Sequence, residues 1–254
     1  MSDEVQTTVE HGVMLVTINR PEARNAINAA AAKGIAQAMD ELDSNPAVRL
    51  AILTGSNNTF CSGMDLKAFV RGEVTILGGR GFAGLCESLP KKPLVAAVEG
   101  YALAGGLEIA LACDLIVAAE NSKFGIPEAK RGLVASAGGL MRLPRQIPRL
   151  IAMELALTGD FIDARRAYEL GLVNRIAAPG TALEIARALG HAIAANGPLS
   201  VNASKRIILE SQDWPLDEMF KLQEVIAGPI FKSDDAIEGA TAFAQKRAPK
   251  WRGC

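Results

Sequence analysis

The chain has 254 residues, of which 49% are apolar and 22% charged, and its formal net charge is −1. This length allows one large hydrophobic core, or a main domain with a small appendage. A nearly neutral chain has no overall field to attract nucleic acid or an anionic membrane, so we expect neither as a partner. No apolar run reaches the ~18 residues of a transmembrane helix.

The four cysteines are scattered without a CxxC spacing: Cys61, Cys86, Cys113 and Cys254. This distribution predicts neither a disulfide framework nor a metal site, and it favours reduced thiols in a cytoplasmic compartment. The N-terminal stretch "MSDEVQTTVE" is acidic and lacks the apolar segment of a signal peptide.

Short apolar runs predict strands, and helical spacing of apolar residues predicts a first helix between the first two of them. In chain order we expect a strand at 13–19, a helix at 28–42, and strands at 48–55, 92–100 and 115–119, with a further short strand from residue 123. Alternating strands and helices favour an α/β fold built from repeated ββα-like units.

After about residue 145 the pattern is mostly helical. Helices are expected near 181–196, 199–212, 215–228 and 234–246. A Gly-Pro break at 197–198 favours a boundary near Asn196. We therefore predict an α/β core over 1–196 that carries the active site, and a C-terminal helical region over 197–254.

One carboxylate stands out in the apolar stretch "AAVEGYALAGGLEIALACD" at 96–114, where Glu108 follows a glycine pair in the first turn of a predicted helix. Two adjacent glycines let the backbone turn tightly and let a ligand approach closely. The first N–H groups of a helix have no internal partner and favour negative charge nearby. Glu108 either stabilises the helix dipole only, or faces a ligand at this helix start.

Two further stretches could complete such a site. In "FCSGMDLKAF" at 60–69, Asp65 could cap a helix, and the Met64 N–H could join a donor from the glycine pair to form an oxyanion hole. In "FGIPEAKRGL" at 124–133, Glu128 could join Glu108, because two carboxyl groups in different environments divide acid and base work. The alternatives are a plain connection and a surface turn.

Together these stretches resemble the crotonase superfamily, also called the enoyl-CoA hydratase/isomerase superfamily. The resemblance extends over nearly the whole chain, through "INRPEARNAIN", "GGLMRLPR" and "LTGDFIDARRAYELGLVN", and it looks closest to the enoyl-CoA hydratase and carnitinyl-CoA dehydratase branch. It implies a spiral of ββα units with a C-terminal helical region, assembled as a homotrimer or homohexamer. It also implies an acyl-CoA thioester substrate, so that coenzyme A is part of the substrate and no separate cofactor is needed.

The resemblance also assigns roles to residues. It places the oxyanion donors at the backbone N–H groups of Met64 and Gly105, water activation at Glu108 and proton transfer at Glu128. It suggests CoA or substrate contacts for Arg24, Ala26, Ser62, Gly63, Asp65, Leu66, Lys67, Leu103, Gly106 and Lys246. The family often has a third glycine where this chain has Ala104. Because both glutamates are present, enoyl-CoA hydratase is favoured, with a carnitinyl-CoA-type dehydratase or an isomerase as alternatives.

Readings outside this family are weaker. The sequence "GRGFAG" at 79–84 fits the G-x-G-x-x-G of dinucleotide-binding proteins, but the strand before it is short and the helix predicted at 82–89 spans about two turns. NAD binding is therefore disfavoured. The chain has no G-x-S-x-G motif and only two histidines, which argues against serine hydrolysis. A non-catalytic scaffold would not need both glutamates.

Overall fold

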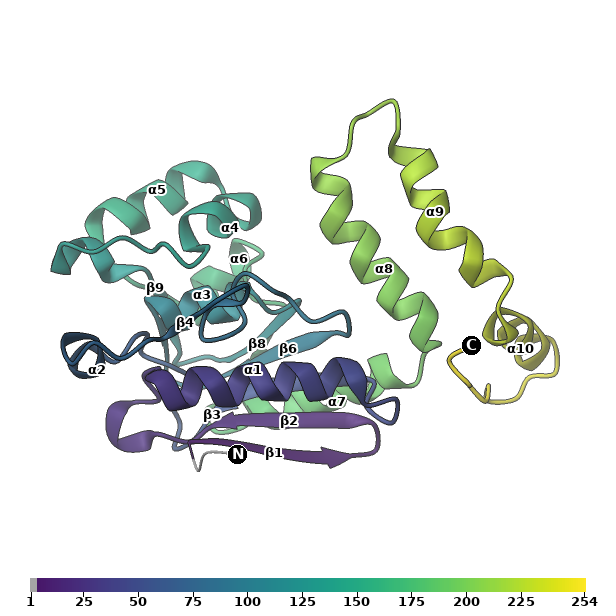
Figure 1. The fold of residues 1–254 in the computed structure, drawn as a ribbon, viewed down its shortest axis with the longest axis horizontal. Helices are drawn as coiled ribbons and strands as arrows, with labels where there is room; N and C mark the ends of the chain where they lie inside the picture. Colours follow the sequence, from purple (N-terminus) through teal and green to yellow (C-terminus); the bar gives the residue numbers. More distant parts are fainter. Residues whose placement is uncertain (1–3) are drawn as a thin grey trace.

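A six-stranded sheet forms the centre of the structure, a computed structural model that describes residues 4–254 (Figure 1). β1 pairs antiparallel with β2, and the other neighbours pair parallel. The order of strands is β1 (Val5–Glu10), β2 (Val13–Ile18), β3 (Leu50–Gly55), β6 (Leu94–Val98), β8 (Leu115–Ala119) and β11 (Arg175–Ala177).

Helices cover both faces of this sheet. α1 (Ala29–Ser44) lies on one face and α7 (Ala182–Ala194) on the other (Figure 1). Along β3, Leu50 and Ile52 belong to the core under α7, whereas Ala51 and Leu53 belong to the larger core on the α1 side. A sheet buried on both faces needs apolar side chains at every position. The predicted strands therefore appear in the sequence as continuous apolar runs.

Two strand–strand–helix units lie at the centre of the molecule. β6 turns at Gly100, with a φ of +61°, into β7 (Tyr101–Leu103), which leads to α3 (Gly105–Leu111). β8 likewise leads to β9 (Lys123–Gly125) and the 3-10 helix η2 (Pro127–Arg131). β7 and β9 pair in a second sheet with β10 (Ile162–Asp163). This arrangement confirms the predicted ββα units.

Shorter elements connect these units. They are η1 (Pro21–Ala23), α2 (Leu66–Val70), β4 (Ile76–Leu77), β5 (Gly81–Phe82), α4 (Gly139–Gln146), α5 (Arg149–Thr158) and α6 (Ala164–Glu169). The C-terminal region consists of α8 (Pro198–Glu210), η3 (Ser211–Asp213), α9 (Met219–Phe231) and α10 (Asp234–Ala244).

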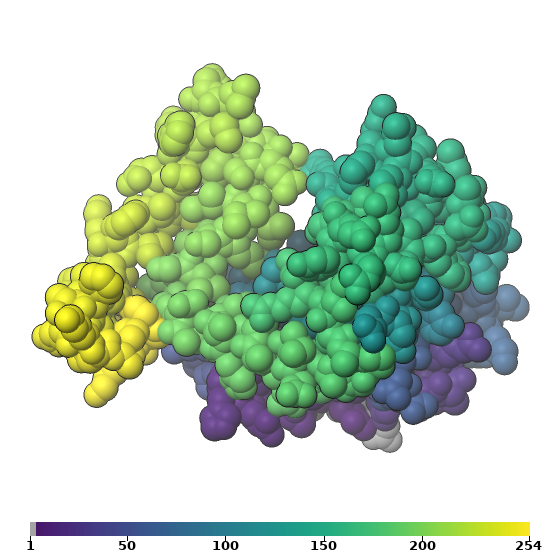
Figure 2. Space-filling model, turned by 180° about the vertical axis from the view of Figure 1, so that it is seen from behind, coloured from purple at the N-terminus to yellow at the C-terminus, as the bar shows by residue number. Residues whose placement is uncertain are grey.

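The C-terminal helices stand away from α4 and α5, with an open notch between the two groups (Figure 2). They are tied to the core at the base of α8, where Lys205 Nζ lies 2.7 Å from Asp114 Oδ2. Trp251 Nε1 also donates to the Ala195 carbonyl oxygen at 2.8 Å. A division into two domains at Asn196 stays a prediction.

The structure confirms the predicted strands and long helices to within a few residues, with one exception. Residues 82–89 form the end of β5 and turns, so the helix predicted there is wrong, and the glycine motif at 79–84 lacks the helix that a dinucleotide fingerprint needs. No helix in the part of the chain described is long and apolar enough to cross a membrane. The signal-peptide prediction involves residues 1–3, which lie outside the described residues.

The turn between β7 and α3 contains a strained residue. Ala104 has φ 53° and ψ −130°, a left-handed conformation that favours glycine. The two glycines that follow are required for a different reason, because neighbouring atoms leave no room for a side chain. A Cβ at Gly106 would collide with the carbonyl oxygen of Cys61, and a Cβ at Gly105 would lie 2.5 Å from Cε1 of Phe82. The glycine pair thus permits close packing, while the unusual backbone angle falls one residue earlier than the pair.

Replacing Ala104 with glycine should stabilise the protein. The substitution removes strain of about 1–3 kcal/mol and costs about 0.4–1 kcal/mol of unfolded-chain entropy. We expect a net gain of about 1 kcal/mol in the free energy of unfolding, measured by denaturant titration. Ala102→Gly, in the regular strand β7, is the matched control and should destabilise. A loss of stability in Ala104→Gly would contradict the assignment of strain.

Candidate active site

A cavity of about 610 Å³ opens at the start of α3. Residues from several separate segments line it, and they include many of the predicted site residues. Those that line it are Arg24, Ser62, Met64, Leu66, Leu103, Gly105, Glu108 and Glu128. The fold therefore brings together the two glutamates and the two backbone positions proposed as oxyanion donors.

Backbone pairing on one side leaves the N–H of Met64 free. Ile27 N donates to Gly63 O at 2.8 Å, and Asp65 N donates to Ile27 O at 2.9 Å, so that Ile27 and Met64 form a parallel bridge. In such a bridge the N–H and C=O of Met64 point away from Ile27. Within residues 4–254 no hydrogen bond engages the Met64 N–H, and Met64 lines the cavity.

Backbone pairing on the other side brings the same loop to Gly105. Cys61 N donates to Tyr101 O at 2.8 Å, and Leu103 N donates to Cys61 O at 3.1 Å. Gly63, with a φ of +103°, then passes so close that a Cβ on it would lie 3.2 Å from Gly105 N.

The N–H of Gly105 has no acceptor in the described part of the chain, and Gly63 leaves it uncovered because it has no side chain. The Met64 N–H described above is the second unpaired donor on the same cavity. Two donors on one cavity are what an oxyanion hole requires.

Glu108 is a buried carboxylate that accepts a hydrogen bond from the backbone. Every residue of α3 is buried, and Glu108 is only 3% exposed. Its Oε1 accepts from the N–H of Gly139, the first residue of α4, at 2.9 Å. Burial raises the pKa of Glu108, whereas the hydrogen bond from Gly139 opposes this rise by favouring the ionised form.

Glu128 lies at the start of η2 and has a different environment. Its Oε2 is buried and has no hydrogen-bond partner among the described residues. The pKa of Glu128 is raised to about 7: burial is the main cause and the charge of Glu108 adds to it, whereas the residue's own backbone N–H and Arg131 oppose the rise. The pair can therefore hold one proton near neutral pH, with Glu128 as the favoured site and Glu108 as the carboxylate.

Several predicted CoA or substrate contacts do not line the cavity. Asp65 turns toward Arg20 and caps α2. Lys246 follows α10, which lies at the opposite end of the molecule from α2 (Figure 1). The others outside the lining are Ala26, Gly63, Lys67 and Gly106.

Three residues at the site were not predicted from the sequence: Phe82, Arg131 and Gly139. Phe82 lines the cavity beside Gly105, and Arg131 lies near the Glu128 carboxyl group. Gly139 supplies the donor to Glu108. Its signal was the second glycine pair before a helix, in "GGLMRLPR". Phe82 and Arg131 carried no such signal, because only the fold brings them to the cavity.

The raised pKa of Glu128 predicts how stability depends on pH. Between its ordinary value of 4.5 and about 7, the folded state binds more protons than the unfolded state, so stability falls as pH rises through this range. Glu128→Gln removes this titration. The variant should have a higher Tm than the wild type above pH 7, and the difference should shrink toward pH 4.5. Equal Tm differences at both pH values would contradict the raised pKa.

Comparison with known proteins places this cavity in a family. A profile described as "Enoyl-CoA hydratase/isomerase" matches residues 8–254. The enoyl-CoA hydratase EchA19 of Mycobacterium tuberculosis is 45% identical over 94% of this chain and 92% of its own length. The carnitinyl-CoA dehydratase of Proteus mirabilis is 37% identical over the full length of both.

Solved structures agree. The crystal structure of an enoyl-CoA hydratase from Mycobacterium tuberculosis has a TM-score of 0.98 at 59% identity, over 100% of both chains. A carnitinyl-CoA hydratase from Mycobacterium avium has a TM-score of 0.80 at 40% identity, also over 100% of both chains. The matching profile, the full-length relatives and the shared fold lead to one conclusion: this chain belongs to the enoyl-CoA hydratase/isomerase family, the crotonase superfamily.

Proposed function

We propose that the protein is an enoyl-CoA hydratase, which reversibly adds water across the 2,3 double bond of a 2-enoyl-CoA thioester. The observation that carries this proposal is the pair of glutamates in one cavity, Glu108 with a hydrogen bond from Gly139 N–H and Glu128 with a buried Oε2 that has no partner among the described residues. Hydration needs a base for water and an acid for carbon, and these environments separate the two roles. The names of the relatives support the same reaction.

The backbone donors would act on the thioester. When water attacks Cβ, electron density moves to the thioester oxygen and an enolate develops. The N–H groups of Met64 and Gly105 would donate to this oxygen, and each such donor contributes roughly 3–4 kcal/mol to transition-state stabilisation in a comparable site.

The two carboxyl groups would move the protons. Ionised Glu108 takes a proton from water while the water oxygen bonds to Cβ. Protonated Glu128 then gives its proton to Cα, and the enolate electrons form the new C–H bond. Glu108 leaves the cycle protonated and Glu128 ionised, so a proton must pass back before the next hydration. Elimination of water follows the same path in reverse.

The dehydratase alternative has its own support. Carnitinyl-CoA dehydratases match this chain over its full length, and elimination of water needs the same residues. An isomerase would need only one of the two carboxyl groups. A panel of enoyl-CoA and hydroxyacyl-CoA esters, assayed for loss or gain of the absorbance of the conjugated thioester, separates these activities. Absence of turnover with every ester would contradict the proposed function and favour the scaffold.

Both glutamates should be required for hydration. Glu108→Gln and Glu128→Gln should each lower kcat at least about 100-fold, because each removes a base or an acid. Folding should persist, since a glutamine oxygen can still accept from Gly139 N–H. Glu99→Gln is the matched control: its oxygens accept from Ala182 N at 2.9 Å and Gly180 N at 3.1 Å, outside the cavity.

Glu99→Gln should retain activity. Full hydratase activity in either cavity variant would contradict the two-carboxylate mechanism. Isomerase activity that survives only one of the two changes would favour the isomerase alternative.

We also propose that the chain assembles as a homotrimer or homohexamer. Large apolar side chains of the C-terminal region, on its helices and in the turn before α9, are more than half exposed, which is typical of an interface. They are Ile208, Leu216, Phe220, Val225, Phe231, Ile237 and Phe243. In such an assembly, Lys246 of one copy would be free to approach the CoA bound by another copy, as it does not line the cavity of its own chain. A cytoplasmic location stays a prediction from the scattered cysteines.

The proposed assembly can be tested by replacing one exposed aromatic side chain. Phe220 on α9 is 83% exposed, so Phe220→Asp should leave the fold intact but place a charge in the interface. We expect sedimentation at micromolar concentration to give a trimer or hexamer for the wild type and smaller species for the variant. A monomeric wild type would contradict the proposal.

A further inference from the structure

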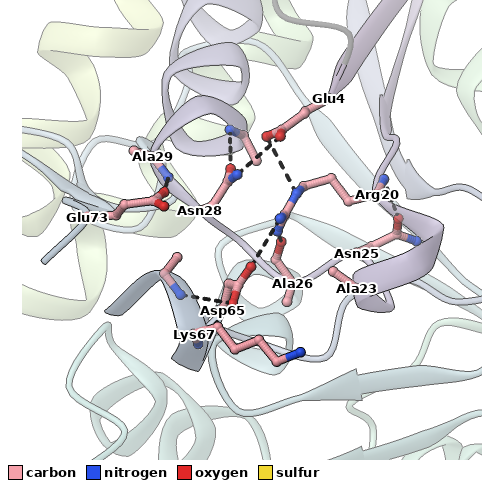
Figure 3. Close-up of polar contacts among 12 residues, drawn as sticks. Glu4, Arg20, Ala23, Asn25, Ala26, Asn28, Ala29, Asp65, Lys67 and Glu73 are labelled. Carbon is pink, nitrogen blue, oxygen red and sulfur yellow. Dashed lines mark hydrogen bonds and ion pairs between the residues drawn. The ribbon is translucent and has the colours of Figure 1, made fainter. Parts of the chain in front are cut away.

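Arg20 is a buried cation behind the loop that carries Met64. Its side chain is 10% exposed, and a buried guanidinium needs partners. Nη2 donates to Asp65 Oδ2 at 3.0 Å, Nη1 donates to the Ala26 carbonyl oxygen, and Nε lies 3.5 Å from Glu4 Oε2 (Figure 3). These contacts join segments that are far apart in the sequence.

Asp65 uses its two oxygens for different tasks. Oδ1 caps α2 by accepting from Lys67 N at 3.0 Å and Ala68 N at 3.1 Å, while Oδ2 accepts from Arg20 (Figure 3). Burial alone would raise the pKa of Asp65, but the hydrogen bonds from Ala68 and Arg20 outweigh it and lower the pKa. Asp65 is therefore a carboxylate near neutral pH, and it directly follows Met64.

The Arg20 guanidinium thus donates hydrogen bonds to both sides of the parallel bridge between Ile27 and Met64. It holds the carbonyl of Ala26, next to Ile27, and the carboxylate of Asp65, next to Met64. The planar fork of arginine fixes the directions of its donors, which a lysine cannot do. Any shift of the Met64 loop away from Ile27 would have to break one of these hydrogen bonds.

Asn25 anchors the backbone of Arg20. This fully buried amide accepts from Arg20 N at 2.9 Å and donates to Ser56 O at 2.9 Å (the Arg20 contact is drawn in Figure 3). Arg20 is therefore held at both ends, by Asn25 at its backbone and by Asp65 at its guanidinium. It has little freedom to follow a displaced loop.

We propose that Arg20 and Asp65 are positioning residues, which hold the Met64 N–H at the place where the thioester oxygen becomes an oxyanion. This inference rests on the proposed function. It gives Asp65 a different role from the substrate contact implied by the family resemblance. A donor misplaced by about 1 Å can cost as much as 100-fold in rate, so the positions of these two side chains would control kcat rather than substrate binding.

The test compares Arg20→Met, Arg20→Lys and Asp65→Ser. Serine still caps α2 but is too short to reach Arg20, so Asp65→Ser keeps the helix and removes the ion pair. We expect kcat for a 2-enoyl-CoA to fall about 10- to 100-fold in Arg20→Met and Asp65→Ser, with KM changed less than about threefold. Arg20→Lys should be intermediate. The double variant Arg20→Met/Asp65→Ser should lose little more than either single variant.

A spectroscopic probe reports on the donor directly. The absorbance of a para-dimethylaminocinnamoyl-CoA thioester moves to longer wavelength when its carbonyl is polarised by hydrogen bonds. We expect this shift on binding to the wild type, and a smaller shift on binding to Arg20→Met and Asp65→Ser. A loss of stability alone would reduce the amount of folded protein but not the shift of the bound probe.

A second buried ion pair provides the matched control. Lys205 and Asp114 have side chains 9% and 19% exposed, against 10% and 13% for Arg20 and Asp65, but they join α8 to the core away from the cavity. Asp114→Ser should lower Tm while leaving the shift of the bound probe unchanged.

The outcomes separate the inference from the proposed function. A full probe shift and wild-type kcat in Asp65→Ser and Arg20→Met would overturn the inference. A raised KM with unchanged kcat would also overturn it, and would return Asp65 to substrate binding. If the wild type itself neither hydrates any 2-enoyl-CoA nor shifts the probe, the proposed function fails, and the inference fails with it.

Discussion

The site depends on the backbone pairing of the loop at 61–65, which is held on both sides. Ile27 pairs with one side of it and Ala102 with the other. Both bridges are parallel; the one to Ile27 leaves the Met64 N–H unpaired, and the N–H of Gly105 has no partner among the described residues because Gly105 is the first residue of α3. The loop thereby ends up between the segment after β2 and the strand before α3, and two unpaired N–H groups come to line one cavity. The glutamates would have no polarised thioester to act on if this loop were displaced.

Burial raises the pKa of both carboxyl groups in the cavity, and their hydrogen bonding sets them apart. A buried carboxylate without partners is costly, yet Glu128 Oε2 has none within the described residues. The cost is lowered because the group can bind a proton near neutral pH. Glu108 is more deeply buried but keeps a donor from Gly139. Different hydrogen bonding thus distinguishes two chemically identical side chains, which is a general way to divide acid and base roles.

Close packing around α3 explains why this region uses small residues. Gly106 lies against the carbonyl of Cys61, Gly105 lies against the ring of Phe82, and Gly63 leaves Gly105 N uncovered. Each is fixed by a neighbour from another part of the chain. Ala104 instead carries a left-handed backbone with a side chain, a local strain that the surrounding pairing holds in place. Strain of this kind is common beside functional sites.

The sequence by itself determined the elements and the chemical groups. Apolar runs predicted the buried strands, helical spacing predicted the long helices, and the motifs singled out Glu108, Glu128, Met64 and Gly105. These features are local, because strand and helix patterns depend on neighbouring residues. β1 was missed, since a largely exposed edge strand shows no apolar run.

Only the tertiary structure decided which groups meet. Ile27 and Met64 pair although they lie 37 positions apart in the sequence, a contact that no local pattern predicts. It also turned Asp65 toward Arg20, and it left Asp65 and Lys246 outside the lining of the cavity. The helix predicted at 82–89 did not form, and Phe82 instead packs beside Gly105. Side-chain direction depends on which segments pair, and pairing is a property of the whole fold.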